Sequence, residues 1–285
     1  MNFCARFAIN PLDLVESTVI RFITYLSQSA VAPATVRVYL AGVRAWYIAN
    51  GNPPPLIYTQ RVRWCLRALD RQAPSPSRVR PFTCSMLRIV AQHIVYSHQS
   101  VVFYSSMLLG YYGCLRASEY LPAPGSRSNL LPTHLRFVNA STPYFLVNIQ
   151  SSKTAHKGFQ LVVGCSGSEV CAVCWLRHLL AIRTLPPHLP LFSLPSGELV
   201  TRAALAAFMQ QSLRKAGLDH TNISPHSLRA GAATDAAGIG ASDVAIQQLG
   251  RWRSSAYRAY VRPSNQQRAS SAQFLASARA HPSAP

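Results

Sequence analysis

Four side chains near the end of the chain have the types and spacing needed for chemistry at a phosphodiester. His226 and Arg229 lie one helical turn apart, Trp252 follows at a helix boundary, and Tyr260 comes eight residues later. A guanidinium can neutralise non-bridging oxygens, an imidazole can move a proton, an indole N–H can donate a hydrogen bond, and a phenol can be the nucleophile. The set therefore predicts attack of a tyrosine hydroxyl on a phosphodiester.

Two questions about this set stay open from the residues alone. Tyr257 and Tyr260 both offer a phenol, and residues three apart on a predicted helix need not point in one direction. Only three of the 28 basic residues are lysines, and Lys153 and Lys157 fall together in a predicted hairpin tip. Lysine can release a proton at useful pH whereas arginine cannot, so either lysine could supply a titratable cation.

Arg116 is a further candidate cation. It follows an apolar helix and Gly113, three residues before Glu119. One interpretation is a surface arginine paired with Glu119. The functional one is an arginine that the carboxylate holds from below and aims at a phosphate.

The ordered set resembles a known family. His226-Ser-Leu-Arg229, then Gly250-Arg251-Trp252, then Tyr260, resembles the C-terminal signature of the tyrosine recombinase (phage integrase) superfamily. The segment from Leu115 to Tyr120 resembles the family's first-arginine motif. The most similar branch is that of eukaryotic DIRS, Ngaro and Crypton elements, which suits the short separation of Trp252 and Tyr260. The resemblance covers about residues 10–263.

The resemblance implies a site, a mechanism and a set of partners. Tyr260, rather than Tyr257, would form a covalent 3′-phosphotyrosyl link, and Lys153, with Lys157 as the alternative, would protonate the leaving 5′-oxygen. No metal, ATP or other cofactor is expected. The implied catalytic residues are Arg116, Lys153, His226, Arg229, Trp252 and Tyr260, supported by Glu119. A homo-tetramer on two double-stranded DNA sites is implied as well.

The surrounding patterns predict a mainly α chain with a small antiparallel β-sheet (α+β). Apolar periodicity predicts helices over residues 12–28, 33–50, 60–71, 83–98, 100–113, 171–184, 201–216 and 242–249. Period-two patterns predict strands over residues 135–138, 144–149 and 159–163. The Pro/Ser-rich residues 74–82 predict a linker between a helical core-binding domain, residues 1–73, and a catalytic domain, residues 83–285.

The charge of the chain predicts a polyanionic partner. There are 28 basic and 9 acidic residues, a net charge of +19, and such a surplus is typical of proteins that bind nucleic acid. The alternative is that a GC-rich genome raises the arginine content of the whole chain without a polyanionic partner. Arg63, Arg67 and Arg71 form an i, i+4, i+8 stripe on one predicted helix in which only Asp70 is acidic, and this favours phosphate contact over a solvated face. The candidate DNA-binding residues are Arg37, Arg44, Arg63, Arg67, Arg71 and Lys157.

Membrane and metal functions find less support. No run of residues has the length of a membrane span, and no signal peptide is recognisable, so we expect a soluble intracellular protein, nuclear in a eukaryote. The seven cysteines do not suggest a disulfide framework. Cys171 and Cys174, with His178, could suggest zinc, but a second ligand pair at finger spacing is missing. We therefore interpret them as small buried residues at a helix start, with no metal site.

Several functions fit these patterns. The leading hypothesis is a site-specific DNA recombinase or integrase of a mobile element. A type IB topoisomerase shares the chemistry, but a separate N-terminal helical module favours synapsis of two sites. A domesticated, non-catalytic DNA-binding protein is the alternative from another class, although all six implied catalytic residues are retained. An RNA-binding structural protein would have the charge but lacks a common RNA-recognition motif.

Overall fold

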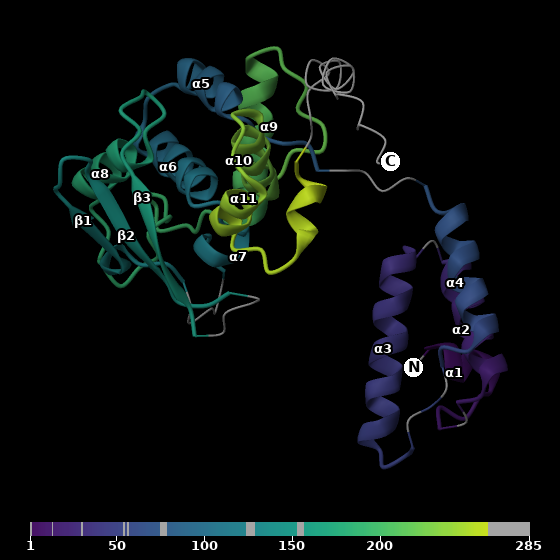
Figure 1. Ribbon diagram of the computed structural model, residues 1–285. Helices are drawn as coiled ribbons and strands as arrows, with labels where there is room; N and C mark the ends of the chain where they lie inside the picture. The colour runs from purple at the N-terminus through teal and green to yellow at the C-terminus, as the bar shows by residue number, and fades with distance from the viewer. Residues whose placement is uncertain are drawn as a thin grey trace, which may run out of the picture. The chain divides into compact units, whose positions relative to one another are not determined.

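The computed structural model describes residues 2–12, 14–29, 31–53, 55, 57–74, 79–123, 129–152 and 157–261. The chain divides into two compact units, residues 1–77 and 78–285. The predicted fold class, mainly helical with a small antiparallel sheet, is confirmed (Figure 1). None of the described helices combines the length and apolarity that crossing a membrane would need.

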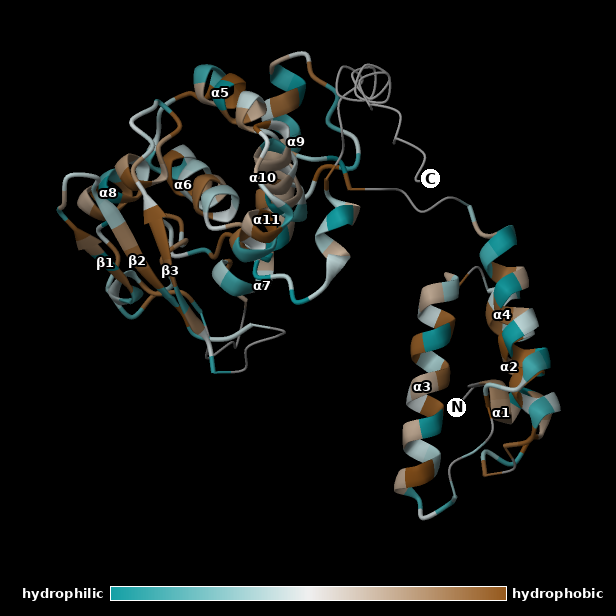
Figure 2. Ribbon diagram, in the orientation of Figure 1, coloured by the Kyte–Doolittle hydropathy of each residue, from teal (hydrophilic) through white to brown (hydrophobic). Residues whose placement is uncertain are grey.

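The smaller unit is a helical module with its own core. Its described helices are α1 (Asn2–Phe7), α2 (Glu16–Gln28), α3 (Pro33–Ala49) and α4 (Gln60–Gln72). Figure 2 shows that α3 and α4 mix hydrophobic and hydrophilic surfaces, as amphipathic helices do. Their apolar faces and that of α2 meet in one buried cluster: Val19, Ile23, Leu26, Val36, Leu40, Ile57, Val62 and Leu66.

The start of this unit differs from the prediction. Helix α2 begins at Glu16 and not at residue 12, because the Asn10 side chain accepts a hydrogen bond from the Leu12 N–H at 3.0 Å and closes a turn there. Helix α1 was not predicted. It has only six residues, and it is held by Phe3, whose ring packs 5.1 Å from Phe22 and 5.5 Å from Tyr25.

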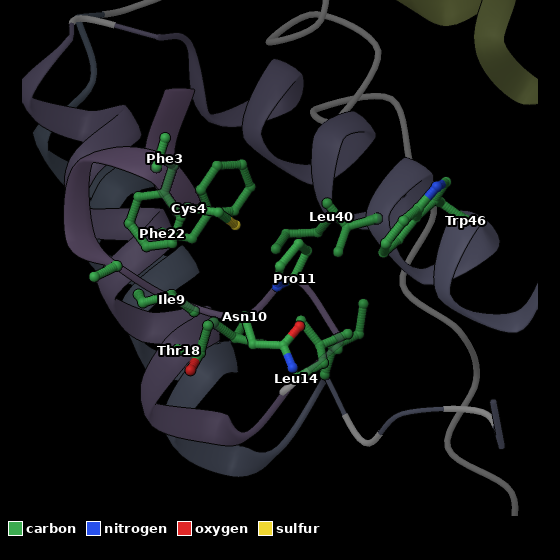
Figure 3. Close-up of a pocket in the computed structure, with 15 residues that line it drawn as sticks. Phe3, Cys4, Ile9, Asn10, Pro11, Leu14, Thr18, Phe22, Leu40 and Trp46 are labelled. Atoms are coloured by element: carbon green, nitrogen blue, oxygen red, sulfur yellow. The ribbon is translucent and has the colours of Figure 1, made fainter. Parts of the chain in front are cut away.

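An apolar pocket of about 760 Å³ lies inside the smaller unit (Figure 3). Side chains of α1, α2 and α3 line it, among them Phe3, Phe22, Leu40 and Trp46. The described residues around it include no Asp, Glu, Lys or Arg, and none of the predicted catalytic residues. The pocket is therefore not the place where chemistry is expected.

The larger unit is built around one buried helix, α6 (His98–Tyr112). Residues 100–111 are all buried, because α8 (Ala172–Ile182) packs along α6 and α10 (His226–Gly238) packs against it too. The further described helices are α5 (Cys84–His93), α7 (Ala117–Tyr120), α9 (Arg202–Lys215) and α11 (Asp243–Gly250), with short 3₁₀ turns η1 (Pro132–His134) and η2 (Ser255–Ala259). In Figure 1, α9, α10 and α11 gather on the side of the unit away from the sheet.

The sheet has the order β1-β2-β3 with antiparallel pairing. Its strands are β1 (Leu135–Val138), β2 (Tyr144–Ile149) and β3 (Phe159–Gly164), as predicted except that β3 is one residue longer. In β2 the side chains of Phe145, Val147 and Ile149 are buried while the residues between them are less so, which is the alternation of a half-buried strand. The sheet thus presents one face to the core of the larger unit.

The end of the predicted linker belongs to the larger unit. Phe82 is fully buried, and its N–H donates to the Ser227 carbonyl at 2.8 Å. Arg80 pairs with Asp219 at 2.6 Å. Residues 79–82 are therefore docked rather than free. Sequence alone did not reveal this, because the docking partners lie about 140 residues further along the chain.

Gly231 on α10 allows this docking. A Cβ atom at this position would lie 1.8 Å from the Phe82 carbonyl oxygen. We expect Gly231→Ala to lower the free energy of unfolding of the larger unit by about 3 kcal/mol, since overpacking forces backbone shifts. Chemical denaturation measures it. Gly238→Ala, on the same helix with nothing within 4 Å of its Cβ, is the matched control; equal losses in both variants would contradict the argument.

Candidate active site

Helix α10 places His226 and Arg229 one turn apart, at its first residue and its fourth. Residues 227–233 are all buried. Ala230, Gly231, Ala232 and Ala233 add little bulk, so this helix can pack closely against its neighbours. The sequence thus buries the arginine deeply while the imidazole stays near the edge of the unit, and Arg229 is the largest fully buried side chain among the described residues.

Arg229 is held from three sides. Its Nη1 donates to the Cys114 carbonyl at 2.9 Å, and its Nη2 donates to the Gly250 carbonyl. The Trp252 ring covers the guanidinium, with 4.4 Å from Cζ to the ring centroid. Burial, together with the nearby Arg116 and Arg251 charges, lowers the pKa of Arg229 from its ordinary value. At 1% exposure, the Arg229 side chain is shielded from solvent.

Two residues with positive φ lie where the chain turns to place the carbonyls that bind Arg229. Cys114 ends the turn after α6 with φ of 44°, and Arg251 ends α11 with φ of 55°. At both places the chain turns and leaves a carbonyl facing Arg229. A Cβ at Gly250 would lie 1.8 Å from Trp252 Cζ3, so glycine is what lets the indole fold back over the helix end.

Glu119 is a fully buried carboxylate that forms ion pairs with two arginines. Its Oε1 accepts from Arg116 Nη1 at 2.9 Å, and its Oε2 accepts from the Arg116 N–H at 2.8 Å. Arg251 Nη2 lies 3.5 Å from the same Oε2. The Arg116 and Arg251 side chains keep 25% and 26% exposure. Glu119 therefore fixes two cations that remain partly open to solvent, as predicted for Arg116 alone.

Tyr260 lies against the imidazole of His226. His226 Nε2 is 3.0 Å from the Tyr260 hydroxyl oxygen, and the Trp252 and Tyr260 ring centroids are 5.6 Å apart. The Thr234 hydroxyl donates to the Tyr260 carbonyl at 2.7 Å and also to Ala230. Helix α10 therefore carries the imidazole and also anchors the backbone of the tyrosine.

Tyr257 is placed differently. It is 1% exposed and packs with Ala233 and Ile246. Its hydroxyl oxygen accepts a hydrogen bond from Arg258 Nε at 3.3 Å. Tyr257 lies in the short 3₁₀ turn η2, and Tyr260 directly follows that turn, where the sequence predicted one helix. Of the two phenols, that of Tyr260 is the one beside His226.

The imidazole of His226 is suited to accept a proton. Burial lowers the pKa of His226 from 6.5, and the charges of Arg229, Arg202 and Arg116 lower it further. The side chain is therefore neutral at neutral pH. A neutral imidazole 3.0 Å from a phenol can take the proton when that oxygen attacks an electrophile.

The other predicted residues are distributed as follows. Lys153 lies outside the described residues, while Lys157 is exposed in the turn before β3. Arg37, a predicted DNA-binding residue, donates from its two terminal nitrogens to the Asp70 carboxylate at 3.0 and 2.6 Å. The other predicted DNA-binding arginines, Arg44, Arg63, Arg67 and Arg71, are exposed.

Two cations of the site were not among the predicted residues. Arg251 contacts Glu119 and donates to the Gly113 and Cys114 carbonyls at 3.1 Å; its place beside Trp252 was the available signal. Arg202, the exposed first residue of α9, lowers the pKa of His226. No sequence signal marked it, because it lies 24 residues before His226.

Comparison with solved structures supplies the fold relationship. The chain is similar to the XerH site-specific recombinase bound to palindromic difH substrate, with 15% identity and a TM-score of 0.62 over 93% of this chain and 71% of that one. It is similar to the Tn1549 transposon integrase in complex with transposon right-end DNA, with 14% identity and a TM-score of 0.60 over 94% and 87%.

A lambda integrase dimer bound to a COC′ core site is a third similar structure, with 16% identity and a TM-score of 0.55 over 88% of this chain and 81% of that one. No protein-family model and no curated protein matches the sequence. The likeness is therefore one of fold: the chain has the fold of tyrosine recombinases and integrases.

Proposed function

We propose that the protein is a site-specific DNA recombinase that cuts and rejoins strands through a covalent 3′-phosphotyrosyl intermediate. The observation that carries the proposal is the 3.0 Å approach of the Tyr260 hydroxyl to a neutral His226, on a fold shared with recombinases. Arg229 lies one helical turn from His226 on α10, and the charges of Arg229 and Arg116 both lower the pKa of His226. A nucleophile, a base and cations to meet developing charge are thus together.

The proposed step balances as follows. The Tyr260 oxygen attacks phosphorus and forms the P–O bond while its proton passes to Nε2 of His226. The bond to the 5′-oxygen breaks, and that oxygen takes a proton from an acid, for which we propose Lys153. Arg116 and Arg229 neutralise the non-bridging oxygens, and Trp252 donates its indole N–H. The phosphotyrosyl bond keeps the energy needed for rejoining, so the step requires neither metal nor ATP.

In the proposed mechanism, DNA binding uncovers the guanidinium of Arg229. In the structure the Trp252 ring covers the guanidinium, whereas the proposed reaction needs both groups on one phosphate. We propose that the indole moves away from the guanidinium when DNA binds. Catalytic hydrogen bonds often form only in the substrate complex.

Partners and biological setting follow from the same proposal. The similar XerH recombinase and Tn1549 integrase structures are complexes with DNA, and a similar lambda integrase structure is a tetramer bound to a Holliday junction. We propose double-stranded DNA as the partner, a homo-tetramer on two sites as the working assembly, and a eukaryotic DIRS-, Ngaro- or Crypton-type element as the origin, with action in the nucleus. The net charge of +19 supports the DNA partner.

The decisive experiment is adduct formation on a nicked suicide duplex. Duplexes from the sequences flanking the gene would be incubated with the protein without divalent metal, and denaturing gels would detect covalent protein–DNA product. An adduct establishes the reaction class. Tight, salt-sensitive binding with no adduct on any flanking duplex would contradict it and favour a non-catalytic DNA-binding protein.

The pH dependence tests the role of His226. Because the base must be neutral and burial lowers its pKa from 6.5, the single-turnover rate of adduct formation should fall only as the pH drops through this lowered pKa, at a lower pH than an ordinary imidazole would give. Arg202→Gln removes one cation that lowers this pKa, so the fall should begin at a higher pH. Stopped time courses across pH measure this. A profile that Arg202→Gln leaves unmoved would contradict the assignment.

The arginine stripe of α4 (Arg63, Arg67 and Arg71) should contribute to the electrostatic part of DNA binding. All three are exposed. We expect each Arg→Gln change to reduce the slope of log K against log salt by about 0.9, the effect of one lost phosphate contact on B-DNA. Fluorescence anisotropy at several salt concentrations measures the slope. The control Arg61→Gln, on the same helix but paired with Glu16 at 3.4 Å, should change it less; equal effects would argue against the stripe.

A further inference from the structure

A cluster of three thiols lies away from the candidate active site. The Sγ atoms of Cys165, Cys171 and Cys174 all lie within 4.8 Å of one another, and those of Cys165 and Cys171 are 3.4 Å apart. Cys165 directly follows β3, Cys171 precedes α8, and Cys174 lies in its first turn. The sequence prediction of two small buried residues at a helix start therefore missed a third sulfur.

We propose that Cys165, Cys171 and Cys174 form a binding site for Zn²⁺. In tetrahedral zinc sites Zn–S is about 2.3 Å, which corresponds to S···S separations of about 3.8 Å. The three sulfurs are already near that spacing, so small side-chain rotations would complete the geometry. Soft thiolate ligands select zinc over hard cations such as Mg²⁺.

The loop that joins the ligands is held in place by its own hydrogen bonds. The Cys165 N–H donates to the Pro143 carbonyl at 2.8 Å, which fixes the end of the β2–β3 ladder, and the Cys171 N–H donates to Ser168 at 3.1 Å. Trp175 Nε1 donates to the Glu169 carbonyl at 3.0 Å. The three thiols are thus brought together by a constrained loop, which lowers the entropic cost of binding.

The three thiols leave a fourth ligand position on the proposed ion. His178, which the sequence suggested as a ligand, instead hydrogen-bonds the Tyr96 hydroxyl. Cys174 is exposed, whereas Cys171 is buried. The fourth position would therefore face solvent and take a water molecule.

A bound ion would cross-link the end of β3 to the start of α8. Both elements contribute to the core of the larger unit, since Val163 and Leu176 are buried there. Binding to the folded state alone raises its stability. The proposed ion is thus structural and independent of the phosphodiester chemistry, and a failure of either proposal leaves the other standing.

The test uses the full chain, stripped of metal and reduced with a phosphine. Titration with Co²⁺ should give one ion per chain, with the thiolate-to-cobalt charge-transfer absorption and the d–d bands of tetrahedral Co²⁺, and Zn²⁺ should displace it. Each of Cys165→Ser, Cys171→Ser and Cys174→Ser should abolish stoichiometric binding. Cys84→Ser, outside the cluster, should retain it. Absence of the charge-transfer band, or its survival in any cluster variant, would overturn the proposal.

A second measurement needs no variant. Zn²⁺ should slow alkylation of the three cluster thiols in the wild-type chain, read by peptide mass spectrometry, and leave the rate at Cys65 of the smaller unit unchanged. Zinc should also raise the melting temperature of the wild type. Equal protection of Cys65 would identify nonspecific metal binding and refute the site.

Discussion

Replacing Tyr260 with phenylalanine should abolish the covalent protein–DNA adduct, whereas Tyr257→Phe should retain it. The Tyr260 hydroxyl is 3.0 Å from His226 Nε2, and phenylalanine removes the nucleophilic oxygen with little change in shape. Tyr257 is buried, and its hydroxyl oxygen accepts a hydrogen bond from Arg258 Nε. Denaturing gels with a nicked suicide duplex read both variants, and DNA binding measured by anisotropy should be unchanged in Tyr260→Phe.

The same pair of variants separates chemistry from folding. Tyr257→Phe removes a hydrogen-bonding hydroxyl and should lower the free energy of unfolding by about 1 kcal/mol, which slows adduct formation only slightly. Tyr260→Phe removes the hydrogen bond to His226 and should lower the free energy of unfolding by a similar amount, about 1 kcal/mol, so a loss of adduct confined to Tyr260→Phe reflects chemistry rather than folding. An adduct that survives Tyr260→Phe and disappears in Tyr257→Phe would move the nucleophile to Tyr257 while keeping the reaction class.

Arg229→Ala should damage both the reaction and the fold. Removing a cation that meets developing charge costs on the order of 10²–10³-fold in rate in other enzymes. The change also leaves the Cys114 and Gly250 carbonyls without their donor and removes the support of the Trp252 ring. Since Arg229 is a large buried side chain, the free energy of unfolding should fall by about 3–5 kcal/mol.

Arg229→Lys distinguishes these two losses. Lysine keeps the positive charge, but its single nitrogen lacks the planar fork that reaches two carbonyls at once. We expect intermediate stability and an adduct rate still far below that of the wild type. Chemical denaturation and single-turnover assays measure the two effects. The exposed Arg214 on α9 gives the control Arg214→Ala, and a rate in Arg229→Lys equal to that of the wild type would contradict a positioned guanidinium.

The fold was largely predictable because local patterns and tertiary packing agree. The alternation in β2 and the apolar periodicity of α4 place the same residues in the core that the structure buries there. Prediction failed where a short-range polar contact sets the end of a helix, or where a residue packs against a partner far along the chain. The Asn10 side chain stops α2 from starting earlier, and Phe82 docks on a carbonyl of α10 far along the chain.

In the candidate site too, features within one helix were predictable, and features that depend on tertiary contacts were not. The spacing of His226 and Arg229 is a property of one helix, so sequence could place them on one side. The sharing of Glu119 between Arg116 and Arg251 depends on how the turn after α6 meets the end of α11, and no local pattern encodes it. Likewise, the thiol of Cys165 joins those of Cys171 and Cys174 only because the loop after β3 returns to α8.

The hydrogen bond from Thr234 to the Tyr260 carbonyl bears on which protomer of an assembly would supply the nucleophile at each site. It fastens the segment that carries the nucleophile to the helix that carries the base and an arginine of the same chain. With that bond in place, each protomer would cut the strand at its own site, in cis, and would not lend its tyrosine to a neighbour. In such an assembly the neighbours would govern when a protomer acts, and the protomer itself would supply the nucleophile, the base and the guanidinium.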